Sequence, residues 1–216
     1  MGCVDLASRR AARLVVRTKA KPFPLRSETP PADSPKAFSC SCASSAFVMA
    51  NIAVRVNRKV KAGKHAILDV FPGLDRSKAF RSVFPDGMRE EVLRDCKIDV
   101  VPEDMYMYID DKAGNVVAGL GYLREGDEKI VYLDVLHELT HIRQWHAGRE
   151  LWDRRYNYVD RPTEIEAYQV AVDEARHLGM RDREIAEYLR VEWTSREEHE
   201  RLCKHLGVRS PESRAV

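Results

Sequence analysis

Two histidines and a glutamate, in the run His137-Glu138-Leu139-Thr140-His141, have types and spacing that suit metal chemistry. On a helix, positions i and i+4 lie on one face, so both imidazoles can point at one ion. Zn²⁺ binds imidazole nitrogen, and a catalytic zinc takes three protein ligands and leaves one position for water. Glu138 can then act as the general base toward the metal-activated water. The motif therefore predicts a zinc-dependent hydrolytic site with His137 and His141 as ligands.

A third ligand is available on the next helix that the sequence predicts. Glu164 lies 23 residues after His141, and Glu166 is the competing candidate. Residues two positions apart on a helix point about 200° apart, so only one of the two carboxylates can face the ion. Thr163 and Glu166 have the spacing of a capping box, which gives Glu166 a structural role. We therefore favour Glu164 as the ligand and keep Glu166 as the alternative.

The region from Tyr106 to Met180 resembles the gluzincin branch of zinc peptidases, and most of all the small minigluzincins. It is also somewhat similar to zinc peptidases that cleave phage-type repressors. In gluzincins a helix bearing His-Glu-x-x-His precedes a helix bearing a Glu ligand, which Glu164 matches. A polar residue four positions later supports a histidine, often as Asp; Tyr168 stands there in this chain. The resemblance also implies that residues 129–133 form an edge strand that binds substrate backbone.

The reaction class implies one further group at the site, and a second family pattern is excluded by its spacing. Hydrolysis of a peptide bond requires a group that stabilises the tetrahedral intermediate, and Tyr156, Tyr158 and His177 are the candidates. The metzincin pattern does not fit, because it requires a glycine and a third histidine where Gln144 and Ala147 stand.

The order of elements predicts an α+β fold with a zincin-like arrangement. We expect a small, mostly antiparallel sheet packed on the active-site helix and on a following Glu-bearing helix, with further helices at the C-terminus. The predicted strands cover residues 66–71, 105–109, 116–123 and 129–133, and the predicted helices cover residues 88–96, 134–147, 163–178, 183–191 and 194–207. His65, His199 and His205 lack a partner pattern and are expected to face solvent.

The first 48 residues differ from the rest of the chain. They contain five prolines, and eight Lys or Arg against three acidic residues. Three interpretations stay open: a disordered tail, an organellar targeting segment, or a natural start at Met49. We expect the zincin-like domain to comprise residues 49–216. The five cysteines are odd in number and form no Cys-x-x-Cys pair, which favours free thiols in a reducing compartment.

These observations predict a cytoplasmic zinc metallopeptidase that acts on a peptide or a protein. Neither a nucleic-acid partner nor a membrane is expected, because the basic excess lies before residue 49 and no apolar stretch is long enough to span a bilayer. The alternative is a regulatory module that keeps the zinc scaffold, binds a protein partner and has no significant turnover. A zinc hydrolase acting on a non-peptide bond is a third possibility.

Overall fold

The computed structural model describes residues 54–210, so the predictions for residues 1–48 and for a start at Met49 lie outside the described residues. The fold is α+β, as the sequence predicts, with a four-stranded sheet in the order β1-β2-β4-β3. The sheet is mixed, because β2 and β4 run parallel while β1–β2 and β3–β4 are antiparallel. The strands are β1 (Gly63–Ala66), β2 (Lys97–Val101), β3 (Met107–Asp110) and β4 (Asn115–Gly119).

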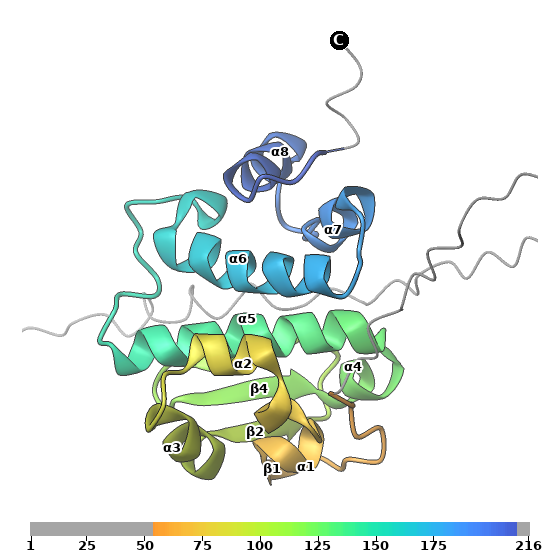
Figure 1. Cartoon of the computed structure of the whole chain (residues 1–216), viewed down its shortest axis with the longest axis vertical. Coiled ribbons are helices and arrows are strands. Elements are labelled where there is room, and N and C mark those ends of the chain that lie inside the picture. Colours follow the sequence, from red (N-terminus) through yellow and green to blue (C-terminus); the bar gives the residue numbers. More distant parts are fainter. Residues whose placement is uncertain (1–53, 211–216) are drawn as a thin grey trace, which may run out of the picture.

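Helices cover the sheet and form a second layer beyond it. Figure 1 shows α5 crossing the middle of the molecule, with the sheet on one side and α6, α7 and α8 on the other. The described helices are α1 (Ile67–Val70), α2 (Lys78–Val83), α3 (Met88–Asp95), α4 (Leu120–Glu125), α5 (Glu128–His146), α6 (Pro162–His177), α7 (Asp182–Tyr188) and α8 (Arg196–His205), with 3₁₀ turns at Leu74–Arg76 (η3) and Tyr158–Asp160 (η4). Among residues 54–210, no helix has the length and apolar character needed to cross a membrane.

The hairpin of β3 and β4 forms where the sequence predicts it. Met107 and Ile109 alternate with the exposed Tyr108, as expected for a half-buried strand. Gly114 has a φ of 65°, a left-handed conformation that glycine adopts without steric cost, and this allows the tight turn. The second strand of the hairpin, predicted at residues 116–123, is shorter than expected, because β4 ends at Gly119 and the chain continues as α4.

The prediction of a strand at residues 129–133 is wrong. The Asp127 side chain accepts hydrogen bonds from the backbone amides of Lys129 and Ile130, and this cap starts α5 at Glu128, six residues before the predicted helix. Val131, Tyr132 and Leu133 are all buried, because the helix lies between the sheet and α6. Three consecutive apolar residues obscure the period of 3.6 residues, and a short apolar run of this kind resembles a buried strand.

The predicted strand at residues 66–71 is also largely wrong. Only Ala66 belongs to β1, and Ile67–Val70 form the short helix α1. Ile67, Val70 and Phe71 are fully buried, and a short apolar run of this kind does not distinguish a strand from a buried helical turn.

The C-terminal helices agree more closely with the sequence. Ser195 caps α8 in a capping box with Glu198, and Gly207 follows the helix with a φ of 61°. The expectation that His199 faces solvent is wrong. It is buried between α7 and α8, where its Nε2 lies 2.7 Å from the carbonyl oxygen of Ala186. His205 is exposed and His65 is half-buried.

Helix α6 packs against α5 through a stripe of small side chains. Ala167, Ala171 and Ala175 are spaced four residues apart and are fully buried, so the two backbones can approach closely. Glu164 lies one turn before Ala167 and therefore shares this inward face. The packing of alanines thus brings the Glu164 carboxylate to the side of α5 that carries the two histidines.

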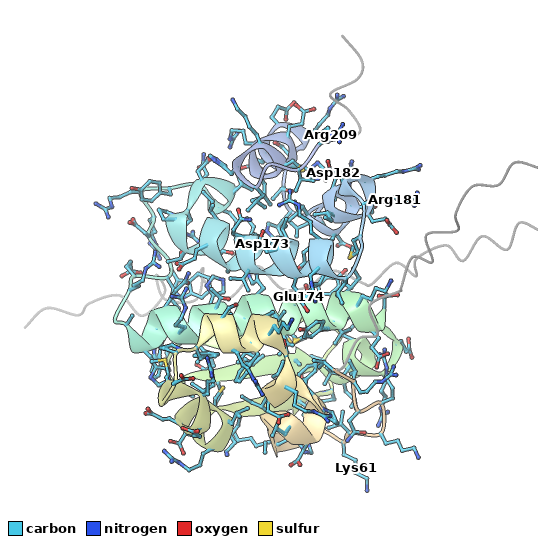
Figure 2. All side chains as sticks on the ribbon, in the orientation of Figure 1. Lys61, Asp173, Glu174, Arg181, Asp182 and Arg209 are labelled. Carbon is cyan, nitrogen blue, oxygen red and sulfur yellow. The ribbon has the colours of Figure 1, made fainter. Side chains whose placement is uncertain are left out.

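A polar bridge fixes the other end of this interface. The hydroxyl of Tyr132 on α5 lies 2.7 Å from Ser77 Oγ and donates a hydrogen bond of 2.9 Å to Glu174 on α6. Figure 2 shows Glu174 on the side of α6 that faces α5, whereas Asp173 lies on the outer side. This bridge connects the N-cap of α2 with both central helices.

We expect Tyr132→Phe to lower the free energy of unfolding by about 1–3 kcal/mol, because buried groups that bonded to the hydroxyl lose their partner. Urea denaturation measures this difference, and Tyr156→Phe is the matched control, since Tyr156 is 42% exposed. Equal stability of the two variants would show that the bridge contributes nothing to the fold.

Candidate metal centre

Three buried side chains converge between α5 and α6. His137 and His141 lie one turn apart on α5, and their Nε2 atoms are 3.1 Å apart. Oε2 of Glu164, in the first turn of α6, lies 3.4 Å from the first of these nitrogens and 3.5 Å from the second. All three residues are buried, and this cluster of two histidines and a glutamate can hold a metal ion.

The carboxylate oxygen that faces the two histidines lacks an ordinary hydrogen-bond partner, while the two Nε2 atoms lie within hydrogen-bond distance of each other. Glu164 Oε2 is buried and accepts no hydrogen bond of normal geometry from residues 54–210. Burial acts to raise the pKa of Glu164, but the two histidines outweigh it and hold that pKa below its usual range. Burial lowers the pKa of His137, while the Glu164 carboxylate raises the pKa of His141 against the effect of burial. The Glu164 carboxylate is thus charged, and a positive charge beside it stabilises it. Either a protonated histidine or a bound metal ion supplies that charge.

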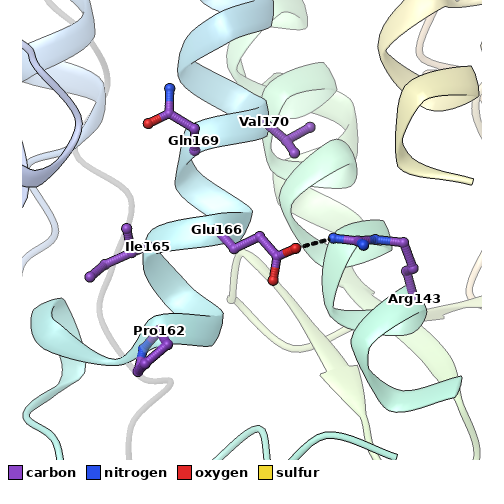
Figure 3. A pocket seen from close by; sticks show the side chains of 6 residues that line it. All are labelled: Arg143, Pro162, Ile165, Glu166, Gln169 and Val170. Carbon is purple, nitrogen blue, oxygen red and sulfur yellow. Dashed lines mark hydrogen bonds and ion pairs between the residues drawn. The ribbon is translucent and has the colours of Figure 1, made fainter. Parts of the chain in front are cut away.

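The structure places Glu166 outside the cluster. Its side chain is one-third exposed and forms ion pairs with Arg143 and Arg149. Figure 3 shows Glu166 pointing from α6 toward Arg143 on α5. The expected capping box is absent, because α6 begins after Arg161 and the Thr163 hydroxyl donates to the carbonyl of Leu151 instead.

Gln144 is a residue of the site that the sequence analysis missed. Its Oε1 lies 2.8 Å from Nδ1 of His141, and its amide nitrogen donates to the carbonyl of Thr163 and to Glu166. If Gln144 Oε1 accepts a hydrogen bond from a protonated Nδ1, the unprotonated Nε2 of a neutral His141 faces the cluster as an acceptor. The signal was present, because Gln144 stands three residues after His141 and shares its helical face.

Glu138 lies next to the cluster without joining it. The residue is buried, and burial raises the pKa of its carboxyl to about 8, against the opposing effect of His141. Its carboxyl interacts with the backbone of Ile109 in β3, which is an edge strand of the sheet. The edge strand beside the active-site helix is therefore β3, in place of the residues 129–133 that the resemblance implied.

Two tyrosines border the histidines. The ring centre of Tyr168 lies 4.3 Å from that of His137, so this residue supports the histidine by ring packing. The Tyr168 hydroxyl is 2.8 Å from the hydroxyl of Tyr158, which belongs to η4. Burial raises the pKa of Tyr158, and the charges of Glu164 and Glu138 act in the same direction, so this phenol stays protonated beside the cluster.

The other two residues considered for the intermediate lie elsewhere. Tyr156 is exposed, with the Arg155 guanidinium 5.9 Å from the centre of its ring. His177 is exposed at the last position of α6, 13 residues after Glu164 and thus roughly 20 Å along the helix axis. Of the three candidates, only Tyr158 lies beside the cluster.

Two hollows of the described surface are separate from the cluster. One of about 450 Å³ is lined by Arg143, Pro162, Ile165, Glu166, Gln169 and Val170 and is seen in Figure 3. Another, of about 530 Å³, lies along residues 150–155. Neither contains His137, His141 or Glu164, so the case for a functional site rests on the converging ligand atoms.

Comparison of the chain with family models, curated proteins and solved structures found no match.

Proposed function

We propose that the cluster binds zinc and that the protein is a zinc-dependent peptidase of the gluzincin type. The spacing of the three ligand atoms carries this proposal. Tetrahedral zinc with bonds of 2.0–2.1 Å to nitrogen or oxygen places its ligand atoms roughly 3.3 Å apart. The atoms of His137, His141 and Glu164 are 3.1–3.5 Å apart. A set of two imidazoles and one carboxylate is also the donor type of catalytic zinc sites.

The side chains around the cluster suit hydrolysis of an amide bond. A zinc ion held by His137, His141 and Glu164 would supply a Lewis acid that polarises a carbonyl and activates water. Glu138 then takes the proton of the attacking water and passes it to the leaving amine. The Tyr158 hydroxyl donates a hydrogen bond to the oxygen on which negative charge develops. Gln144 and Tyr168 keep the two imidazoles oriented.

An enzyme accounts for Glu138 better than a regulatory zinc module does. Burial of a carboxyl costs stability, and a purely structural zinc site does not need a carboxyl beside its ligands. The zincin-like arrangement is likewise a proposal, supported by the two ligand-bearing helices packed beside a small sheet.

Digestion of a peptide library by the zinc-loaded protein tests this function. We expect cleavage that stops when zinc is removed with a chelator and returns when zinc is added back. Mass spectrometry of the products identifies the bonds that are cut. A protein that binds one zinc per chain, leaves every library peptide intact and retains a peptide or protein partner would support the regulatory alternative.

We also expect Gln144→Leu to weaken zinc binding by about 10–100-fold, because His141 loses the group that orients its ring. Competition with a chromophoric zinc chelator measures the affinity. Gln169→Leu is the matched control, since Gln169 lies on the outer side of α6 and hydrogen-bonds only to Asp173 among the described residues. Unchanged affinity of the Gln144 variant would mean that packing alone orients His141.

A further inference from the structure

Asp134 occupies the same face of α5 as Glu138, one turn earlier, and phenols surround it. The Tyr122 hydroxyl donates a hydrogen bond to Asp134 Oδ2. The Tyr188 hydroxyl also lies near this carboxylate, but its buried oxygen has no hydrogen bond of normal geometry within residues 54–210. The negative charge of Asp134 acts to raise the pKa of both Glu138 and Tyr168, so Asp134 adjoins the candidate metal centre.

A second carboxylate extends this surface outward. Tyr106 packs edge-on against Tyr122, with ring centres 5.2 Å apart, and its hydroxyl interacts with Glu192. Glu192 is exposed, and the other four residues are partly exposed. We call Tyr106, Tyr122, Asp134, Tyr188 and Glu192 the acidic–aromatic patch. Its residues come from α4, α5, the end of α7 and two loops, and in Figure 1 α4, α7 and the start of α5 lie at the same end of the molecule.

The charge of the patch is not balanced within the described protein. No lysine or arginine of residues 54–210 forms an ion pair with Asp134 or Glu192. A partly buried carboxylate without a counter-ion is costly. The faces of tyrosine rings attract cations, and an arginine or ammonium group suits a site that combines them with a carboxylate. A merely structural Asp134 would only need to accept the Tyr122 hydrogen bond, which the side-chain oxygen of an asparagine also accepts.

We propose that the acidic–aromatic patch binds a cationic group of the substrate, either a lysine or arginine side chain or a free α-amino group. This inference rests on the proposed peptidase function and names the class of substrate. Side chains at i and i+4 of a helix lie about 5–6 Å apart, and an extended peptide advances about 3.3 Å per residue. The cation therefore belongs within about two residues of the bond that Glu138 helps to hydrolyse.

Matched peptides that differ in one charge test this inference. Eight-residue pools of otherwise neutral sequence carry either one arginine at the centre or its neutral isostere citrulline, each with a free or an acetylated N-terminus. Cleavage by the zinc-loaded full chain gives kcat/KM, and fluorescence anisotropy of labelled pools gives affinity even where no cleavage occurs. The enzymes compared are wild type, Asp134→Asn, Glu192→Gln and, as a control, Asp173→Asn on the outer side of α6.

We expect wild type to prefer a charged pool over its neutral partner by about 10–100-fold, in keeping with a hydrogen bond to a charged group. Asp134→Asn should lower kcat/KM and affinity for the charged pools to the values that the same variant shows for the neutral pools, so that the preference is lost. Glu192→Gln should reduce the preference, and Asp173→Asn should leave it unchanged. Arginine dependence in acetylated pools identifies a side chain, whereas sensitivity to acetylation identifies the α-amino group.

The two proposals fail in different ways. Binding that prefers the charged pools without any cleavage would overturn the peptidase function and leave the cation site standing. Cleavage or binding that ignores charge would overturn the cation site. If Asp134→Asn does not fold, as judged by circular dichroism, Glu192→Gln alone decides, because its exposed side chain is replaceable without loss of packing.

Discussion

Glu138→Gln is expected to keep its zinc and to lose between two and four orders of magnitude in kcat, the range typical of lost general-base catalysis. The amide has the shape of the carboxylate but cannot take a proton from water. Glu138 lies beside the three ligands and is not one of them, so metal content should stay near one zinc per chain. Activity on the best library peptide and metal analysis of the same sample measure both quantities.

The matched control for this variant is Glu187→Gln, which removes a carboxylate from the exposed side of α7 and should leave kcat unchanged. Undiminished hydrolysis by Glu138→Gln would contradict the proposed mechanism. Loss of zinc from this variant would instead move Glu138 into the ligand set.

Removal of any one ligand is expected to weaken zinc binding by more than the 10–100-fold that outer groups contribute. His137→Ala, His141→Ala and Glu164→Ala each leave two ligands, and activity should fall with metal occupancy. Glu166→Ala is the informative comparison. Glu166 follows Glu164 by two positions on α6, but it contacts Gln144 and does not belong to the cluster of ligands. Its effect should not exceed that of Gln144→Leu.

Zinc affinity of these variants is best measured at several pH values, since ligand histidines must be deprotonated to bind and affinity should fall as the pH is lowered. Stoichiometric zinc in any of the three ligand variants, at a pH where wild type is saturated, would remove that residue from the site. A greater loss from Glu166→Ala than from Glu164→Ala would reverse the assignment of the third ligand.

The parts of the site that local rules govern were predictable from the sequence. The spacing of His137 and His141 is enough to place both rings on one helical face, and Pro162 marks the start of the helix that carries Glu164. The angle between Glu164 and Glu166 correctly separated the inward carboxylate from the outer one. The proposed cap on Thr163 was nevertheless wrong, because Glu166 pairs with Arg143 of α5 and with Arg149 of the loop after it, and a sequence pattern does not reveal such contacts.

Tertiary contacts determined the features that the sequence did not predict. Residues 129–133 resemble a strand only when the partners of α5 are unknown, since three consecutive buried residues, 131–133, obscure the helical period. His199 appeared to be a surface residue because its partner, the carbonyl of Ala186, belongs to another helix. The acidic–aromatic patch likewise assembles residues from positions 106 to 192, and no local spacing predicts their proximity.

The central position of α5 also determines how the metal centre can open. Twelve of its 19 residues are buried, so its amide protons are expected to exchange with solvent only when the whole domain unfolds. Helix α6 buries seven of its 16 residues, and the loop before it is largely exposed. Opening of the site without global unfolding therefore has to begin in residues 148–164. In the native state, the rate at which an ion leaves would follow the motion of Glu164, while the two histidines stay in place.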